Sequence, residues 1–203
     1  MMTTDNPLST IRAIDPAALE RLQTDLSDQA AAADLLDLGY RTVDSPLGSL
    51  LLVASERGLT RVAFSNQDHE RVLADLAATV SPRILRAPRR LDPAARELEE
   101  YFAGSRRTFD LPLDLTTRDG FRQAVQRLLP NIGYGETVSY TELATRAGRP
   151  TAIRAAASAC ATNPLPVVVP CHRVVRNDGG LGGYLGGLSA KRALLDLEAR
   201  AVA

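Results

Sequence analysis

Cys171 and His172 stand next to each other in the stretch 163–175, which reads Asn-Pro-Leu-Pro-Val-Val-Val-Pro-Cys-His-Arg-Val-Val. Three consecutive β-branched residues favour a short buried strand, and Pro170 cannot donate a ladder hydrogen bond, so we expect pairing to stop just before the cysteine. A cysteine behind an apolar run is commonly an inert packing residue. His172 and Arg173 favour a second interpretation, because a nearby cation stabilises the thiolate, the nucleophilic form of cysteine.

Three cysteine chemistries can be compared with this pattern. A zinc deaminase requires His-x-Glu followed by Pro-Cys-x-x-Cys, and the chain has neither. A cysteine hydrolase needs a base from a distant part of the chain, where the only other histidine is His69. The third is a thiolate that attacks an alkyl carbon, with His172 as its base through a bridging water and Glu198 holding the imidazole. Because adjacent side chains of an extended chain point to opposite faces, a water or a turn must join Cys171 to His172.

Length and composition are those of an ordinary globular protein, with 203 residues, 45% hydrophobic and 24% charged. No run approaches the roughly 20 apolar residues that span a bilayer, and the polar first residues lack the basic and apolar regions of a signal peptide. The two cysteines, Cys160 and Cys171, cannot build a disulfide framework. We therefore expect a cytoplasmic protein that has reduced thiols and no contact with a membrane.

The net charge of zero conceals an asymmetry between the two halves of the chain. Residues 1–120 carry 14 arginines against 19 acidic residues, whereas residues 121–203 carry 10 basic against 5 acidic residues. The basic half contains Cys171. A basic surface attracts phosphates, which indicates a nucleic-acid partner, and the alternative is an ordinary solvated face.

We expect residues 1–14 to be disordered, because they show no hydrophobic period. Asp15 followed by Pro16 is typical of a helix start, with an N-cap and a proline at the first helical position. Apolar residues then recur at helical spacing, which predicts one amphipathic helix over 15–39 that ends near Gly39. We expect its apolar side to pack on the rest of the chain and not on a second copy. That side contains Leu19, Leu22, Leu26, Ala30 and Ala33.

From Tyr40 the hydrophobic period becomes that of strands. The turn signals Ser-Pro-Leu-Gly and Glu-Arg-Gly separate three short β-rich runs, so we predict an antiparallel meander. The runs are 40–43, 49–54 and 59–64. Helices are predicted over 69–80 and 92–104, followed by an edge strand over 108–115. Nothing in this half indicates a chemistry, and we expect His69 to be a surface residue and not a metal ligand.

The second half begins with an amphipathic helix over 121–129. The sequence Ser-Tyr-Thr-Glu over 139–142 matches a capping box and predicts a short helix that closes at Gly148. A second helix is predicted over 151–162, and two short helices joined by a turn that contains glycine predict a helix-turn-helix. This second helix is rich in alanine, so it can approach a nucleic-acid backbone closely, with Arg154 as its one long side chain. The alternative is a buried alanine-rich helix whose Arg154 reaches the solvent.

Six glycines lie within residues 176–187, which allows turns with positive φ and close backbone approach to a ligand. The segment lacks the Lys-Ser/Thr ending of a P-loop and the pattern of a dinucleotide site, so we exclude nucleotide binding. A final helix is predicted over 189–199. Glu198 near its end is unfavourable against the helix dipole unless a cation lies beside it, and His172 is the candidate partner.

These motifs together resemble the O6-alkylguanine-DNA alkyltransferases, also called methylated-DNA-protein-cysteine methyltransferases. The matching features are Asn163-Pro164, Pro-Cys-His-Arg-Val-Val over 170–175, Gly-Tyr-Leu-Gly-Gly-Leu over 183–188, Lys191, and Leu-Leu-x-x-Glu ending at Glu198. The resemblance is specific over 121–198, where it includes Gly-Glu-Thr-Val-Ser-Tyr-Thr-Glu-Leu-Ala over 135–144. It is weaker over 40–118 and does not extend to 1–38.

The resemblance implies direct DNA repair, in which the cysteine accepts the alkyl group of O6-alkylguanine once, without a cofactor or a metal. The implied partner is double-stranded DNA, bound by a monomer through the minor groove with the damaged base flipped out. The implied fold is α+β, with a small N-terminal α/β domain of ribonuclease-H-like topology before a mostly helical winged helix-turn-helix domain. We place these domains at 39–118 and 119–203, and an additional helix within 1–38.

Carried over by motif position, the resemblance also assigns roles to single residues. Cys171 is the methyl acceptor, His172 its base, Glu198 the orienting acid, and Tyr140 the proton donor beside the flipped guanine. Arg154 fills the gap that the base leaves in the duplex. The other assignments are active-site support by Asn163, Pro170, Arg173 and Val174, DNA contact by Thr151, Ala155 and Ser158, and a substrate-pocket loop of Tyr184, Leu185 and Gly186.

The sequence departs from the family pattern in two places. Leu185 stands where many relatives carry a small or polar residue, so contacts to O6 there must come from the backbone. Some members hold a structural zinc in the N-terminal domain, which this chain cannot do because no cysteine precedes Cys160. Alkyltransferase-like proteins bind the same lesions without an acceptor cysteine, so a damage-sensing or regulatory DNA-binding module is the alternative function. The presence of Cys171 favours transfer.

Overall fold

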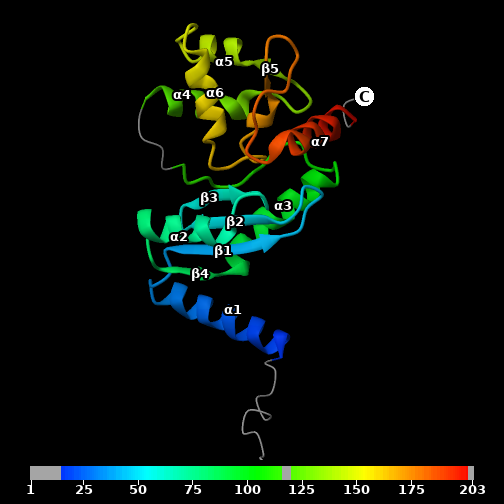
Figure 1. Cartoon of the computed structure of the whole chain (residues 1–203). Helices are drawn as coiled ribbons and strands as arrows, with labels where there is room; N and C mark the ends of the chain where they lie inside the picture. Colours follow the sequence, from blue (N-terminus) through cyan, green and yellow to red (C-terminus); the bar gives the residue numbers. More distant parts are fainter. Residues whose placement is uncertain (1–14, 116–119, 201–203) are drawn as a thin grey trace, which may run out of the picture.

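The computed structural model describes residues 15–115 and 120–200. Figure 1 shows two stacked parts, a sheet with helices built from the first half of the chain and a mostly helical part built from the second half. The disorder predicted for residues 1–14 falls outside the described residues. Within the two described stretches, no helix is both long and apolar enough to cross a membrane.

A four-stranded sheet of order β3-β2-β1-β4 forms the first part. The predicted antiparallel meander is confirmed, with β1 (Leu38–Val43), β2 (Leu50–Ser55) and β3 (Gly58–Ala63). The fourth strand, β4 (Ile84–Arg86), pairs parallel to β1 and was not predicted. Its three residues are too few to show an alternating pattern.

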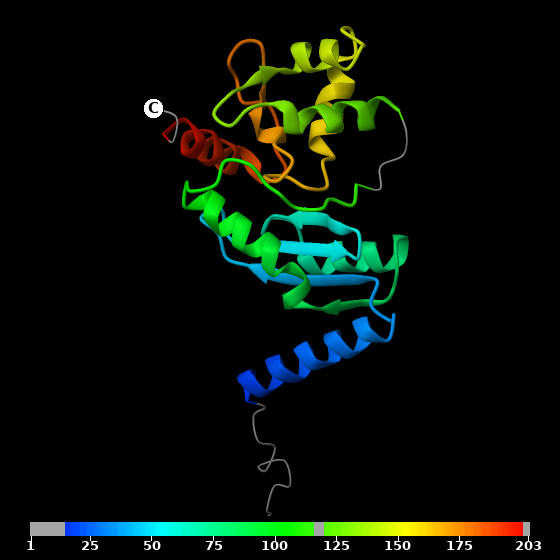
Figure 2. The same ribbon diagram turned by 180° about the vertical axis from the view of Figure 1, so that it is seen from behind.

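Two helices cover opposite faces of the sheet, because successive side chains of a strand point to opposite sides. Leu52 of β2 packs in the cluster that contains α3 (Asp92–Phe102), whereas its neighbour Leu51 packs with α2 (His69–Thr79). Figure 2 shows the green helix α3 crossing in front of the sheet, with α2 behind it. Both helices were predicted close to these limits.

The first helix, α1 (Pro16–Ala32), begins as predicted. The Asp15 carboxylate accepts a hydrogen bond from the backbone N–H of Ala17 at 3.1 Å. The prediction that this helix continues to Gly39 is wrong, since β1 already begins at Leu38. The helix ends at Ala32, and Asp34 just beyond it has a φ of 55°, a left-handed value through which a right-handed helix cannot continue.

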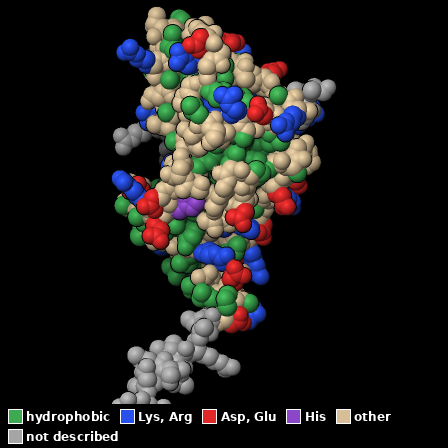
Figure 3. Space-filling view, turned by 45° about the vertical axis from the view of Figure 1, so that its right-hand side comes forward, with side chains coloured by type: hydrophobic (Ala, Val, Ile, Leu, Met, Phe, Trp, Pro, Cys, Tyr) green, Lys and Arg blue, Asp and Glu red, His purple; other side chains and the backbone are tan. Residues whose placement is uncertain are grey.

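The apolar side of α1 does not pack on the rest of the chain, so that prediction is also wrong. Leu19, Leu22 and Leu26 are 42%, 64% and 56% exposed. Figure 3 shows hydrophobic side chains on the surface at this end of the molecule. Arginines in and after β4 bind acidic residues on another face of the helix, which turns the leucines toward solvent. These ion pairs join Arg86 to Glu20 and Arg89 to Asp28.

Residues 108–115 run along the free edge of β3 without forming the predicted strand. They make one isolated bridge, between Leu113 and Leu59. Leu59 N–H donates to the Pro112 carbonyl at 2.8 Å, and Asp114 N–H donates to the Leu59 carbonyl at 2.9 Å. Pro112 has no N–H to donate, so a regular ladder cannot form here.

The second part consists of α4 (Phe121–Leu128), α5 (Tyr140–Arg146), α6 (Ile153–Ala161) and α7 (Gly187–Arg200). All four helices were predicted, although α6 begins after Thr151 and not at it. The turn between α5 and α6 contains Gly148, which has a φ of 77°. Two short strands, β5 (Val138–Ser139) and β6 (Val174–Val175), pair in parallel.

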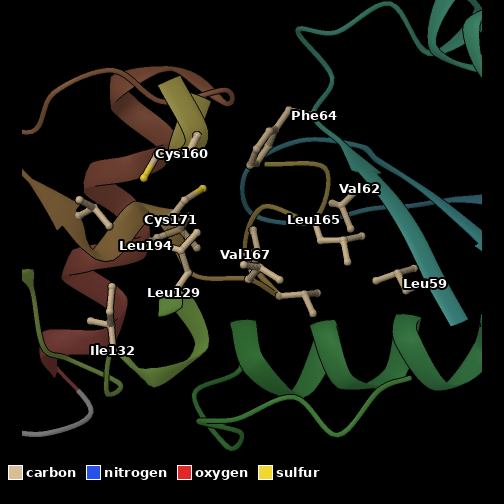
Figure 4. Close-up of a cluster of buried hydrophobic side chains, with 14 of the residues drawn as sticks. Leu59, Val62, Phe64, Leu129, Ile132, Cys160, Leu165, Val167, Cys171 and Leu194 are labelled. Carbon is tan, nitrogen blue, oxygen red and sulfur yellow. The ribbon is translucent and has the colours of Figure 1, made fainter. Parts of the chain in front are cut away.

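One hydrophobic core crosses the boundary between the two parts. Phe64 and Val62 of the first part belong to the same buried cluster as Leu165, Val167 and Cys171 of the second, and Figure 4 shows these side chains together. Val62 N–H also donates to the Pro164 carbonyl at 2.9 Å. The segment that leads to the cysteine is therefore held against the sheet.

Candidate active site

The three valines before Cys171 are buried, but they form a turn and not the predicted strand. Val169 N–H donates to the Leu165 carbonyl at 2.8 Å, which closes this turn. Val167 has a φ of 74°, a rare value for a β-branched residue. Its burial in the core shared by the two parts holds it there. The run of valines thus indicates burial without strand pairing.

Asn163 lies just beyond the end of α6 and joins this turn to the cysteine. Its Nδ2 donates to the Val169 carbonyl at 2.8 Å and to Cys171 Sγ at 3.1 Å. Its Oδ1 accepts from Leu165 N–H at 3.1 Å. One buried amide therefore places the sulfur relative to the end of α6.

Cys171 begins a 3₁₀ turn, η4 (Cys171–Arg173), and is only 2% exposed. Burial raises the pKa of its thiol to about 11, and the hydrogen bond from Asn163 and the charge of Lys191 offset this only in part. The thiol is therefore protonated at neutral pH. Any reaction that uses the thiolate requires a base beside it.

Pro170 and Val174 hold the two ends of this turn. The Pro170 carbonyl accepts a hydrogen bond from Arg173 N–H at 3.1 Å. Val174 is fully buried and pairs with Val138 between β6 and β5. Because Cys171 and His172 lie in a 3₁₀ turn, the strict alternation of side chains in an extended chain does not apply to them.

His172 is fully buried, and its Nε2 lies 2.9 Å from Glu198 Oε1. Its Nδ1 has no hydrogen-bond partner among the described residues. Burial lowers the pKa of His172 although the carboxylate opposes this, so the imidazole is neutral at neutral pH. A carboxylate beside Nε2 holds the proton on that nitrogen, which leaves the lone pair on Nδ1 to accept another.

Glu198 lies in the last turn of α7 and has the cationic partner that its position demands. Arg173 donates from Nε to Oε2 at 2.9 Å and from Nη2 to Oε1 at 2.8 Å. Gly135 N–H donates to Oε2 at 3.0 Å. Burial would raise the pKa of Glu198, but the bonds from His172 and Arg173 hold it well below its usual range. The predicted contact with His172 is confirmed, and the guanidinium of Arg173 is directed at the carboxylate.

Two further buried residues contact this centre and were not predicted to do so. Tyr101, at the end of α3, donates from its hydroxyl to Glu198 Oε1 at 2.6 Å. Lys191 donates to the Val174 carbonyl at 2.5 Å and to that of Leu181. Lys191 is the single lysine among 24 basic residues, and the sequence indicated it only as one of the features that match the family. Tyr101 carried no signal, because in the sequence it looks like one more apolar residue of a helix.

Tyr140 is the first residue of α5, and the preceding Ser139 caps the helix by accepting from Glu142 N–H at 3.0 Å. Burial raises the pKa of Tyr140 to about 12, so the phenol stays protonated. Gly182 has a φ of 68°, and a Cβ on it would lie 2.8 Å from the Tyr140 hydroxyl. The glycine-rich segment therefore lies directly against the phenol, and the positive φ of Gly182 is of the kind that its glycine content predicted.

Tyr184, Leu185 and Gly186 form the part of this segment that leads into α7, and the first part of the chain supports them. Asn66 Nδ2 donates to the Leu185 carbonyl at 3.0 Å. A Cβ on Gly186 would lie 2.9 Å from the ring of Phe64. The rings of Phe64 and Tyr184 meet edge to face with centroids 5.5 Å apart. The Leu185 carbonyl is thus already bonded to the first part of the chain.

The four residues predicted to contact DNA are exposed and lie just before α6 and along one face of it. They are Thr151, Arg154, Ala155 and Ser158. The other side of the helix is buried in the core through Ala156, Ala159 and Cys160. The exposed surface of small side chains around Arg154 and the buried alanine-rich surface were predicted as alternatives, and they lie on different faces of α6. Across residues 15–115 and 120–200, no group of three or more His, Cys, Asp or Glu side chains is arranged to hold a metal ion.

Family models match both parts of the chain. One, described as the ribonuclease-like domain of 6-O-methylguanine DNA methyltransferase, matches residues 38–115. The other, described as the DNA binding domain of 6-O-methylguanine DNA methyltransferase, matches residues 120–200. The chain belongs to the 6-O-methylguanine DNA methyltransferase family.

Two methyltransferases to which this chain is similar match it over nearly their whole length. The methylated-DNA-protein-cysteine methyltransferase of Mycolicibacterium paratuberculosis is 43% identical over 161 residues, which are 79% of this chain and 92% of the relative. The constitutive enzyme of that name from Bacillus subtilis is 39% identical over 160 residues, which are 78% of this chain and 94% of the relative. A crystal structure of Mycobacterium tuberculosis OGT in complex with DNA has a TM-score of 0.70 and 41% identity, and covers 80% of this chain and 94% of that one.

Proposed function

We propose that this protein repairs DNA by transferring the alkyl group of O6-alkylguanine to its own Cys171. The observation that carries the proposal is a buried thiol, bonded by Asn163, that is followed directly in the chain by a buried imidazole, which is bonded to Glu198 and has no partner on its Nδ1 among the described residues. The names of the relatives, methylated-DNA-protein-cysteine methyltransferases, support the same reaction. The reaction is that of an enzyme used once.

The thiol must lose its proton before it can attack. His172 accepts this proton at Nδ1 through a bridging water, and Glu198 stabilises the imidazolium that results. The sulfur of Cys171 then forms a bond to the alkyl carbon while the bond from that carbon to O6 breaks. The electron pair of the broken bond goes to the guanine.

Guanine leaves as an anion unless a proton reaches it, so a donor beside the base lowers the barrier. Tyr140 supplies that proton, since burial keeps its phenol protonated. The proton that His172 took from Cys171 replaces it, so guanine gains one proton and the thiol loses one. The thioether that forms is not labile, and each molecule therefore reacts once, without a cofactor.

We assign the DNA contact to α5 and α6 as the helices of a winged helix-turn-helix. The exposed face of α6 carries small side chains around Arg154, which suits close approach to a minor groove and insertion of one long side chain. The damaged base must leave the stack to reach a sulfur that is 2% exposed. The excess of positive charge in residues 121–203 supports binding to phosphates.

The remaining assignments concern the architecture. We propose a ribonuclease-H-like topology for the N-terminal domain at 39–118, supported by the antiparallel meander with β4 added in parallel. The C-terminal domain occupies 119–203, and the extra helix lies within 1–38. We propose that the protein acts on DNA as a monomer.

The reaction is tested by incubation with duplex DNA that contains O6-methylguanine, followed by intact-mass measurement and peptide mapping. We expect a gain of one methyl group on the peptide that contains Cys171. Cys160→Ser is the matched control, because it removes the other buried thiol and should still gain the methyl group. Tight binding of the damaged duplex with no gain in mass would support a damage-sensing module and contradict transfer.

The DNA contact is tested with Arg154→Ala. Loss of an inserted arginine should weaken binding by about 1–3 kcal/mol, which is roughly tenfold or more, without change in thermal stability. Arg71→Ala on exposed α2 is the control and should bind as the wild type does. Equal affinity of the two variants would show that Arg154 does not enter the duplex.

A further inference from the structure

Tyr101 brings a hydroxyl from the N-terminal domain into the centre formed by His172 and Glu198. The residue is fully buried in the last turn of α3. Its hydroxyl donates to Glu198 Oε1 at 2.6 Å and lies 3.5 Å from His172 Nε2. The single carboxylate oxygen Oε1 therefore contacts both the hydroxyl and the imidazole.

The ring of Tyr101 is held by three aromatic neighbours. Its centroid lies 5.3 Å from that of Phe109, 5.5 Å from that of Phe102 and 6.0 Å from that of Tyr134. Burial and the adjacent carboxylate raise the pKa of Tyr101, so the hydroxyl keeps its proton and acts as a donor. A ring packed in this way holds its hydroxyl in one place, which is what a positioning group requires.

We propose that Tyr101 is a positioning residue for alkyl transfer: its hydroxyl holds Glu198 as an ionised acceptor and thereby keeps His172 in the form with a proton on Nε2 and a lone pair on Nδ1. This inference rests on the proposed function. The N-terminal domain thus contributes a group to the chemistry in addition to its role as a support. The hydroxyl acts through Glu198 and does not touch the substrate.

The physical reason lies in how a donor changes a carboxylate. Each hydrogen bond to Oε1 withdraws negative charge from it and lowers its affinity for a proton. Without Tyr101, the less neutralised carboxylate favours the protonated imidazole more strongly. His172 would then become protonated at a higher pH, and a protonated His172 cannot accept the proton of Cys171.

Tyr101→Phe tests this, because it removes one oxygen and keeps the packed ring. At a pH where His172 is protonated in the variant and neutral in the wild type, we expect the single-turnover rate of methyl transfer to fall about tenfold or more, the effect of one hydrogen bond to a charged group. The acid limb of the rate against pH should also move to higher pH, and affinity for DNA should stay unchanged. Each rate is divided by the number of methyl groups that a molecule of the preparation finally accepts, so that inactive, misfolded protein does not lower the measured rate.

Tyr134→Phe is the matched control. Its ring meets that of Tyr101 edge to face, but its hydroxyl has no hydrogen-bond partner among the described residues. We expect this variant to keep the wild-type rate and pH profile. Wild-type behaviour of Tyr101→Phe, or an equal loss in both variants, would overturn the proposal.

Nitrogen NMR of the histidine rings separates this inference from the proposed function, because it requires no reaction. The chain has two histidines, so His69→Gln leaves the signals of His172 alone. We expect the neutral form with a proton on Nε2 in the otherwise wild-type protein. When Tyr101→Phe is added to His69→Gln, we expect the imidazolium of His172, or its neutral tautomer with the proton on Nδ1, to become detectable. The comparison is made at a pH where the protein with His69→Gln alone shows neither form. Identical spectra wherever both proteins are folded would overturn the role of Tyr101, even if methyl transfer is observed.

Discussion

Glu198→Gln removes one charge from a buried carboxylate and leaves the shape of the side chain almost unchanged. The carboxylate accepts hydrogen bonds from Tyr101, His172, Arg173 and Gly135. In glutamine one of the two oxygens becomes an NH₂ group. If the remaining oxygen keeps its bonds to Tyr101 and His172, the NH₂ group faces the N–H donors of Arg173 and Gly135.

The cost follows from the burial of Arg173. This guanidinium is 7% exposed, and the variant leaves it without a counter-charge. Removal of one partner of a buried ion pair costs about 3–5 kcal/mol of unfolding free energy. At about 2–4 °C per kcal/mol for a chain of this size, Tm should fall by roughly 6–20 °C. The transfer rate should fall by roughly 10²–10⁴-fold, because the imidazolium of His172 loses its support.

Urea unfolding and single-turnover transfer measure the two effects. Glu142→Gln is the control, since its pair with Arg146 is exposed and should contribute no more than about 0.5 kcal/mol. The double variant Glu198→Gln/Arg173→Met should regain part of the lost stability, because it removes the unpaired charge. A loss below about 1 kcal/mol in Glu198→Gln would refute the reasoning, since the ion pair would then not be buried as described.

Two further predictions concern the glycine-rich segment and pH. Gly182→Ala places a Cβ 2.8 Å from the Tyr140 hydroxyl at a φ of 68°, so transfer should slow at least about tenfold while DNA affinity is kept; wild-type rates would show that the phenol tolerates displacement. The free energy of unfolding should fall as the pH drops from 7 to 4. In the folded protein the pKa values of His172 and Glu198 lie below their ordinary values of 6.5 and 4.5, so the unfolded chain binds more protons as the pH falls below each ordinary value. Each pKa unit of difference between the two states contributes about 1.4 kcal/mol to this loss. An unfolding midpoint in urea that is constant over this range would contradict the buried neutral imidazole and the paired carboxylate.

Local patterns predicted most of the secondary structure, because they arise from residues close in the chain. The Asp15 and Ser139 caps and the continuous apolar run of β2 each led to an element that the structure contains. The errors occur where distant residues decide. Pro112 prevents a ladder along β3, and ion pairs from Arg86 and its neighbours turn the leucines of α1 outward.

The valines before Cys171 illustrate the same limit. Their β-branched side chains correctly indicate burial, but local propensity cannot show that Asn163 will close a turn around them. Strand propensity is a preference for a packed, pleated surface, and here the packing is supplied by the sheet of the other domain. The residue types were therefore informative about environment and misleading about backbone conformation.

By itself, the sequence determined which residues could do chemistry: a cysteine joined to a histidine, an acid at a helix end that demands a partner, and a glycine-rich segment able to lie against a side chain. Those inferences depend on residue type and short spacing, which are local properties. Only the tertiary structure decided that Tyr101 donates to Glu198, that Arg173 is directed at this carboxylate, and that the charge of Lys191 opposes the rise in the pKa of the Cys171 thiol. These interactions join residues far apart in the chain, and the one between Tyr101 and Glu198 forms because one hydrophobic core holds both domains together.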